Sequence, residues 1–198
     1  MKLIANALTC ERNGRVVFSG LGFSVAAGEL VELRGPNGSG KSSLLRLIAG
    51  LVPAAAGTLA LLPADDSPLP RHCHYIGHLD ALKNAMTVRE NLAFWSLMLG
   101  GSGDLAALDA FKLTHLADDP VQLLSAGQRR RLSLARLLAA PRRIWLLDEP
   151  ATALDVASQA TLAGLIDDHL KDGGIVLAAI HGEGLCKPNH LIHLGQPT

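Results

Sequence analysis

The sequence lacks several features that would mark particular classes of protein. Lysine plus arginine number 18, as do aspartate plus glutamate, so no excess of positive charge indicates a nucleic-acid-binding protein. Three widely spaced cysteines (Cys10, Cys73 and Cys186) argue against a disulfide framework and favour a reducing cytosol. The chain has neither an internal repeat nor a low-complexity tract. Its 198 residues, 48% hydrophobic and 18% charged, suffice for the core of one domain, which we expect to cover residues 1–198.

An uninterrupted apolar run that could cross a membrane is also missing. The N-terminus does not carry the long apolar stretch of a secretory signal. The uncharged segment Leu47–Ala64 contains four residues that interrupt helices: Gly50, Pro53, Gly57 and Pro63. In lipid such a helix would leave backbone groups unpaired, so we interpret the segment as a helix end, a turn and a strand. Any membrane role would therefore act through a partner.

Strands and helices are predicted to alternate along the whole chain. Apolar or alternating runs predict strands at 3–8, 16–18, 29–33, 144–147 and 175–180. Helical periodicity and helix-capping residues predict helices at 41–49, 87–99, 105–111, 128–139 and 155–170. This alternation predicts an α/β fold with a parallel-sheet core. Residues of about 85–135 are helical and lack a strong strand, so we expect them to form a helical lobe inserted in that core.

A glycine-rich segment after the predicted strand 29–33 matches the P-loop pattern G-x-x-x-x-G-K-[ST]. It consists of Gly35, Pro36, Asn37, Gly38, Ser39, Gly40, Lys41 and Ser42, with Ser43 following. The glycines allow successive backbone N–H groups to point at phosphates. Lys41 would reach the β- and γ-phosphates of ATP, and the Ser42 hydroxyl would bind Mg²⁺. The alternative is a glycine-rich turn that binds nothing, but a strand before it and a helix after it favour the P-loop.

Two carboxylates follow the apolar strand 144–147. Asp148 closes this strand at the edge of the sheet where ligands of open α/β sheets bind, and there it can hold Mg²⁺ through water. Glu149 comes next and is the natural general base for an attacking water. Taken alone, the pair could be a solvated strand end. Beside a P-loop, the catalytic interpretation is favoured.

The segment Leu124–Gln128 resembles the LSGGQ signature of ABC ATPases, with Ala126 in place of the first glycine. Ser125, Gly127 and Gln128 match the signature, and the segment precedes Asp148 by about twenty residues. A helix start capped by Ser125 is the simpler alternative. Physically, Ser125 and the free N–H groups of a helix N-terminus form a surface that binds a γ-phosphate.

The resemblance to ABC ATPases covers nearly the whole chain and implies their fold, a P-loop NTPase core with an inserted helical lobe. It also implies that Ala151–Asp155 is the D-loop, which includes Asp155 and crosses the dimer interface. His181, otherwise an ordinary histidine at a strand end, becomes the switch histidine that contacts the γ-phosphate. In this family the signature of one subunit completes the ATP site of the other. The chain carries one P-loop and one signature, so we expect a head-to-tail homodimer with ATP at its interface.

Two positions depart from the family pattern. His78 stands where ABC ATPases usually have a glutamine, and its imidazole can still hydrogen-bond a metal-bound water, with a charge that depends on pH. Arg12 stands where an aromatic residue usually stacks on adenine; a guanidinium can stack similarly, and the alternative is a solvated arginine in a turn.

The sequence His72-Cys73-His74, shortly before His78, could indicate a metal or haem site. On a strand His72 and His74 would share one face, but no second ligand cluster accompanies them.

These departures and the run Leu124–Arg131 look like the cytochrome c maturation branch of the family, the ATP-binding subunits of bacterial haem exporters. That resemblance implies integral membrane partners of the CcmB and CcmC type, and a peripheral location on the cytoplasmic face of the inner membrane. It also implies that ATP hydrolysis supports haem delivery to apocytochromes. The alternatives are a transporter for another solute, a soluble ABC ATPase of translation or DNA repair, a P-loop kinase, and a regulatory module without turnover.

Overall fold

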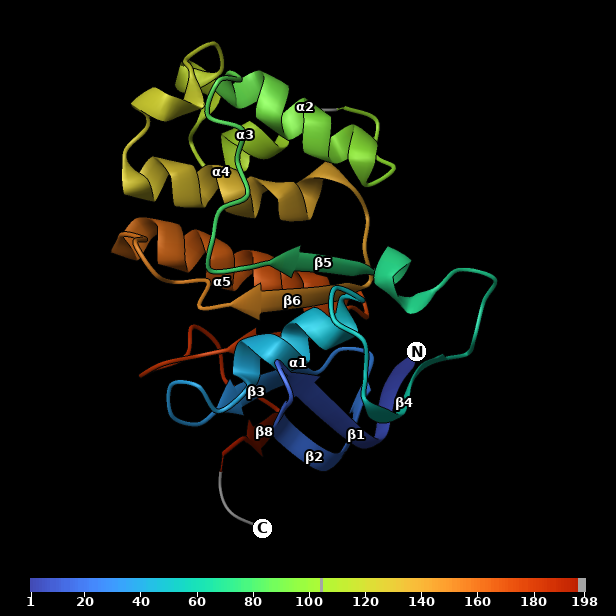
Figure 1. The fold of residues 1–198 in the computed structure, drawn as a ribbon. Coiled ribbons are helices and arrows are strands. Elements are labelled where there is room, and N and C mark those ends of the chain that lie inside the picture. Colours follow the sequence, from blue (N-terminus) through green and yellow to red (C-terminus); the bar gives the residue numbers. More distant parts are fainter. Residues whose placement is uncertain (104, 196–198) are drawn as a thin grey trace.

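A parallel five-stranded sheet forms the centre of the computed structural model, which describes residues 1–103 and 105–195 (Figure 1). Its strands lie in the order β5-β6-β7-β3-β8 and are all parallel to their neighbours. They are β3 (Leu30–Arg34), β5 (Cys73–Ile76), β6 (Ile144–Asp148), β7 (Ile175–Ala179) and β8 (His190–His193). The predicted α/β fold with a parallel-sheet core is confirmed.

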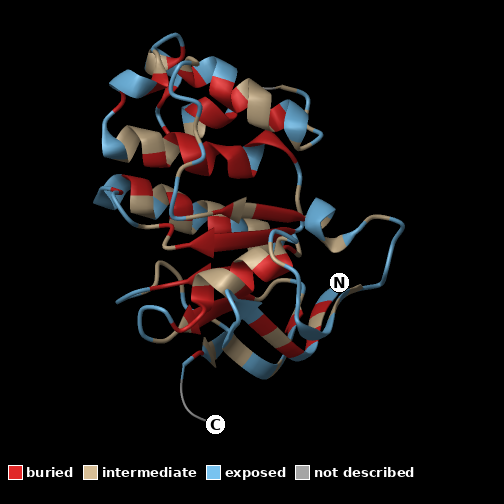
Figure 2. Ribbon diagram, in the orientation of Figure 1, coloured by how far each residue is buried: buried red, intermediate tan, exposed pale blue. Residues whose placement is uncertain are grey.

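Both faces of the central sheet are covered, which explains why β7 and the first four residues of β6 are continuous apolar runs. Every residue of β6 and β7 is buried (Figure 2). Ile144 and Leu146 pack in one hydrophobic cluster, whereas Trp145 and Leu147 pack in the other, because successive side chains of a strand point to opposite faces. Full burial of an apolar side chain of this size contributes about 1.5–3 kcal/mol relative to leaving it exposed.

One face of the sheet is covered by α1 (Lys41–Ile48) and a smaller antiparallel sheet. This second sheet has the order β2-β1-β4 and contains β1 (Lys2–Arg12), β2 (Arg15–Ala26) and β4 (Ala56–Leu62). β4 confirms that Leu47–Ala64 comprises a helix end, a turn and a strand. Among the described residues, no helix is both long and apolar enough to span a bilayer.

The other face is covered by α5 (Val156–Lys171) and by stacked helices above it. These are α2 (Val88–Met98), the short α3 (Ala107–Ala110) and α4 (Ala126–Ala139), drawn at the top of Figure 1. Capping boxes begin two of these helices. Glu90 N donates to Thr87 Oγ1 at 3.2 Å, and Gln128 N donates to Ser125 Oγ at 3.3 Å. These caps fix where α2 and α4 begin.

Some element bounds differ from the predictions. The expected helix 105–111 is reduced to α3, and the expected strand 16–18 is part of the much longer β2. The sequence did not predict β8, nor the single-turn 3-10 helices at Leu69–His72, Thr114–Leu116 and Val121–Leu123.

Candidate functional site

The P-loop joins β3 to α1 at the edge of the sheet where the parallel strands end. Gly35, Gly38 and Gly40 all have positive φ, at 142°, 80° and 102°. A Cβ on Gly35 would collide with the backbone oxygen of Leu194, so the loop requires glycine there for space as well as conformation. Gly40 provides no side-chain cap for α1 and the first turn of this helix carries no acidic residue, so the positive end of the helix can attract an anion.

Lys41 lies beneath this loop, with 6% of the residue exposed. Its ammonium donates to the carbonyl oxygens of Gly35 at 2.7 Å and Pro36 at 3.0 Å. The charge is therefore held against the backbone of the glycine-rich loop.

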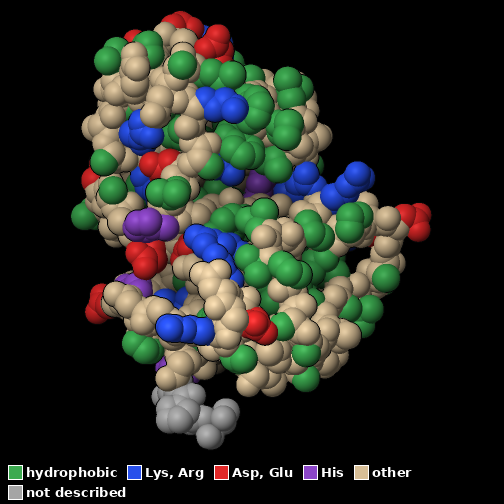
Figure 3. Space-filling view, in the orientation of Figure 1, with side chains coloured by type: hydrophobic (Ala, Val, Ile, Leu, Met, Phe, Trp, Pro, Cys, Tyr) green, Lys and Arg blue, Asp and Glu red, His purple; other side chains and the backbone are tan. Residues whose placement is uncertain are grey.

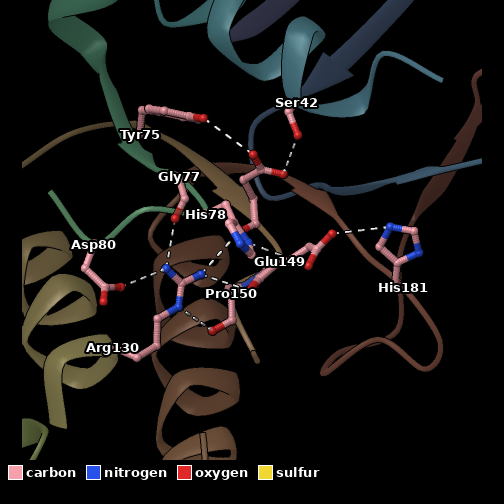
Figure 4. A network of polar contacts seen from close by, with 10 residues as sticks. Ser42, Tyr75, Gly77, His78, Asp80, Arg130, Glu149, Pro150 and His181 are labelled. Carbon is pink, nitrogen blue, oxygen red and sulfur yellow. Dashed lines mark hydrogen bonds and ion pairs between the residues drawn. The ribbon is translucent and has the colours of Figure 1, made fainter. Parts of the chain in front are cut away.

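The end of β6 approaches the start of α1. Ser42 Oγ donates to Asp148 Oδ1 at 2.9 Å, and the Tyr75 hydroxyl lies 3.5 Å from Asp148 Oδ2 (Figure 4). Burial raises the pKa of Tyr75, with the neighbouring Asp148 acting in the same direction. A hydroxyl and a carboxylate in hydrogen-bond contact form the kind of oxygen-donor pair that hard divalent cations bind.

Glu149 follows in a left-handed conformation, with φ of 50°, and its N–H donates to Ala179 O at 3.0 Å. The turn places its carboxylate between two histidines (Figure 4). His181 Nε2 lies 3.3 Å from Glu149 Oε1, and His78 Nδ1 lies 4.0 Å from Oε2. Both imidazoles are partly exposed, so solvent can reach this carboxylate.

A cavity of about 580 Å³ brings these groups together. It is lined by Arg12, Asn13, Val17, Asn37, Gly38, Ser39, Gly40, Lys41, Ser42, Ser43, His78, Asp148, Glu149 and His181. Most of the residues that the sequence singled out therefore surround one space, although they come from five separate parts of the chain. Histidine, acidic and basic side chains gather along the corresponding left edge of the molecule (Figure 3).

The signature residues do not line this cavity. Ser125, Ala126, Gly127 and Gln128 form the cap and first turn of α4, and Ser125 and Ala126 are exposed. A Cβ on Gly127 would lie 3.1 Å from Ala153 O, so the start of α4 sits against the predicted D-loop. Within one chain the signature and the P-loop remain apart.

Asp155 is also outside the cavity and has a local partner. Its Oδ1 accepts a hydrogen bond from Ser158 N at 2.7 Å, which caps α5. Hydrogen bonds from Ser158 hold the pKa of Asp155 below its usual value.

The three residues of the metal or haem alternative do not converge. His72 Nε2 pairs with Asp65 at 3.0 Å, while the buried His74 contacts Ala140 O at 2.8 Å. Cys73 Sγ lies 3.4 Å from Leu69 O. The described part of the chain contains no group of three or more histidine, cysteine or carboxylate side chains arranged to hold a metal ion.

A larger cavity, of about 1070 Å³, lies at the opposite edge of the sheet, where β6 and β7 begin. Its walls include Trp145 and His169, whose rings stack 4.0 Å apart. No P-loop residue, Asp148 or Glu149 reaches it. The smaller cavity is the candidate site because the chemistry converges there.

The sequence interpretation missed Arg130, which lies at the centre of the polar network in Figure 4. Only 4% of this arginine is exposed. The available signal was its position on α4. Leu134 follows it by four residues and Leu137 by seven, which places the three residues on one face of the helix, and that face is buried.

Comparisons with known proteins agree with this geometry. The profile of the family described as ABC transporter matches residues 18–152. Proteins named cytochrome c biogenesis ATP-binding export protein CcmA are similar along nearly their full length. The relative from Nitrobacter winogradskyi is 55% identical over 184 residues, covering 91% of this chain and 92% of its own. The relative from Paramagnetospirillum magneticum is 48% identical over 202 residues, covering 97% of this chain and 93% of its own.

Solved structures share the fold at lower identity. An ABC transporter ATP-binding protein from Pyrococcus furiosus matches with a TM-score of 0.84 and 23% identity, covering 98% of each chain. A dimeric ATP-binding cassette in a post-hydrolysis state, bound to ADP and Pi, matches with a TM-score of 0.81 and 24% identity, covering 97% of this chain and 94% of its own. At these identities the likeness shows a common fold.

Proposed function

This chain belongs to the ABC transporter family, and from that premise we propose that it is the ATP-hydrolysing subunit of an export complex for cytochrome c biogenesis, of the haem-exporter type. One observation carries the enzymatic part: a P-loop lysine, a Ser42–Asp148 pair and the Glu149 carboxylate share a single cavity. The names of the relatives that are 48–55% identical support the assignment to cytochrome c biogenesis.

The triphosphate binds first through the backbone. The N–H groups of the loop and of the first turn of α1 surround the β- and γ-phosphates. Lys41 then exchanges its bonds to the Gly35 and Pro36 carbonyls for phosphate oxygens. Asn37 to Ser43 line the same wall of the cavity and orient the chain of phosphates.

The oxygen pair of Ser42 and Asp148 fits Mg²⁺, which prefers hydroxyl, carboxylate and water ligands. Ser42 would bind the ion directly and Asp148 through water, with His78 placed to hydrogen-bond a water of its shell. When bound, Mg²⁺ neutralises charge that develops on the β- and γ-phosphates.

Glu149 acts as the general base. Its carboxylate accepts a proton from water while the water oxygen attacks the γ-phosphorus and the bond to the bridging oxygen of ADP breaks. His181, 3.3 Å from Glu149 Oε1, orients this carboxylate and donates to the γ-phosphate. The products are ADP and inorganic phosphate, so no acceptor substrate is required.

The second half of each site comes from another copy of the chain. Ser125 and the N–H groups of Ala126, Gly127 and Gln128 present an exposed helix N-terminus that suits a γ-phosphate. Since these residues lie outside the cavity of their own chain, a head-to-tail homodimer would bring each signature to the partner's P-loop. Asp155 and the D-loop would then lie at the dimer interface.

Arg12 supplies the contact for the base. It lines the cavity beside Asn13 and Val17, and its guanidinium would stack on adenine.

Nucleotide-driven closure is passed to integral membrane subunits, of the CcmB and CcmC type, at the cytoplasmic face of the bacterial inner membrane. The segment around His78 connects β5 to the helices above the sheet, which makes it the natural transmission element. Hydrolysis would support delivery of haem to apocytochromes.

The enzymatic proposal is tested with Glu149→Gln, measuring binding of a fluorescent ATP analogue and release of phosphate, for the purified chain and its membrane complex. We expect unchanged binding and a loss of turnover of about 100-fold or more, since general-base catalysis contributes about 10²–10⁴. The exposed Glu11→Gln is the matched control. Hydrolysis by Glu149→Gln at the wild-type rate would show that another group is the base.

The biogenesis assignment has a separate test in cells that carry the same substitution. The c-type cytochromes, detected by a stain for covalently bound haem, should disappear, and the wild-type gene should restore them. Normal levels of c-type cytochromes in the Glu149→Gln strain would remove the haem-exporter assignment and leave the ATPase in place.

A further inference from the structure

Arg130 is a buried charge at the junction of three segments. It lies in α4, two residues after the last residue of the signature, with 4% of the residue exposed, whereas the adjacent Arg129 and Arg131 are half-buried. Burial lowers the pKa of Arg130, and the nearby Asp80, Asp148 and Glu149 raise it. A buried guanidinium persists in a fold when its N–H groups find acceptors, so its partners indicate what it holds in place.

Three of its hydrogen bonds go to consecutive backbone carbonyls at the end of β6. Nη2 donates to Asp148 O at 3.1 Å and to Glu149 O at 2.8 Å, and Nε lies 3.4 Å from Pro150 O (Figure 4). Glu149 has a φ of 50°, a conformation that L-residues adopt rarely and that must be held by its surroundings. The guanidinium binds the carbonyl on each side of this residue and the carbonyl of the residue itself.

The other two bonds reach the segment after β5. Nη1 donates to Gly77 O at 2.8 Å and lies 3.4 Å from Asp80 Oδ1. Arg136 of the same helix donates to Asp80 O at 3.1 Å. His78 therefore lies between two anchor points that α4 provides.

We propose that Arg130 is a positioning residue for ATP hydrolysis, which fixes the strained turn that directs the Glu149 carboxylate and ties the His78 segment to the same helix. This inference rests on the proposed role of Glu149 as the base. A planar fork with five N–H donors can serve both segments at once, whereas the single ammonium of lysine presents a different geometry. The signature forms the start of α4. A movement of this helix would therefore be passed through Arg130 to the Glu149 backbone and to the segment that carries His78.

Arg130 does not line the nucleotide cavity, so it should affect turnover and leave nucleotide binding nearly unchanged. In the membrane complex, Arg130→Lys should lower kcat about 10- to 100-fold, the loss that a small misplacement of a catalytic group produces. The KM for ATP should change less than about twofold. Arg131→Lys is the matched control, since Arg131 donates to Phe111 O within the helices above the sheet. A kcat of Arg130→Lys equal to that of the control overturns the proposal.

A double-mutant cycle separates positioning from a general structural effect. If Arg130 acts through Glu149, Arg130→Lys should cause less than about a twofold further loss in a Glu149→Gln background, because residues that act as a unit are not additive. Losses that multiply overturn the proposal. A Glu149→Gln chain that hydrolyses ATP normally refutes the base assignment instead, so the two failures are distinguishable.

Thermal unfolding of each variant shows whether the substituted chains fold. If Arg130→Lys does not, Asp80→Asn takes its place, because this change weakens one anchor of the guanidinium and leaves the carbonyl bonds. We expect a severalfold lower kcat with the wild-type KM. A folded Asp80→Asn chain with wild-type kcat overturns the proposal.

Discussion

His74 should make the stability of this protein fall as the pH falls. The residue lies in β5, with 1% exposed, and its Nε2 is 2.8 Å from Ala140 O. Burial lowers the pKa of His74 from an ordinary 6.5 to about 4, and the nearby Arg136 and Arg142 act in the same direction. The folded state therefore keeps this imidazole neutral.

The sign of the effect follows from proton linkage. Below pH 6.5 the unfolded chain binds a proton at His74 before the folded chain does, so stability present above pH 6.5 is lost as the pH falls toward 4. The difference between the two pKa values corresponds to about 3 kcal/mol, most of which is lost by a pH of about 4.5.

Urea unfolding at about pH 7 and about pH 4.5 measures this contribution. In His74→Gln, which keeps a donor for Ala140 O, the fall in the free energy of unfolding should be smaller than in the wild type by about 2–3 kcal/mol. His115→Gln, at an exposed histidine, should behave like the wild type. Equal pH dependence in the wild type and His74→Gln would show that His74 is not the source of the lost stability.

Three further outcomes are expected. Phe111→Ala, which removes a side chain that is 2% exposed, should lower the free energy of unfolding by about 3–5 kcal/mol in urea titrations, and a loss below about 1 kcal/mol would contradict the packing described. Thr87→Ala should cost about 1 kcal/mol in the same assay because α2 loses its cap, while an unchanged midpoint would mean that the cap is dispensable. Arg12→Ala should raise the KM for ATP severalfold at constant kcat, and an unchanged KM would exclude stacking on adenine.

The parts of the fold that the sequence predicted are those determined by local chemistry. The side chains of Ser125 and Gln128, three residues apart, each accept a hydrogen bond from the backbone N–H of the other residue. The start of α4 could therefore be predicted from a short stretch of sequence. The apolar run Ile144–Leu147 has no polar face, which identifies a strand covered on both sides. The P-loop was also predictable from local sequence, because the spacing of its glycines, lysine and serine and the strand and helix on either side are enough to identify the loop.

The parts that were missed depend on tertiary partners. β8 is four residues long and mostly exposed, and it becomes a strand because β3 offers it an edge. The positive φ of Glu149 could not be predicted from the sequence, because glutamate does not favour this conformation. Arg130 looked like one of three similar arginines, and only the packed structure shows that its guanidinium meets backbone carbonyls more than fifteen residues away in each direction along the chain.

In the proposed mechanism two copies of the chain enclose each nucleotide, with the P-loop of one copy facing the signature of the other. Sedimentation of Glu149→Gln with and without ATP, compared with Glu149→Gln carrying Ser125→Glu, tests it most directly. ATP should convert Glu149→Gln from monomer to dimer, while the chain that also carries Ser125→Glu should bind ATP and remain a monomer. Equal ATP-dependent dimerisation of the two proteins would contradict it.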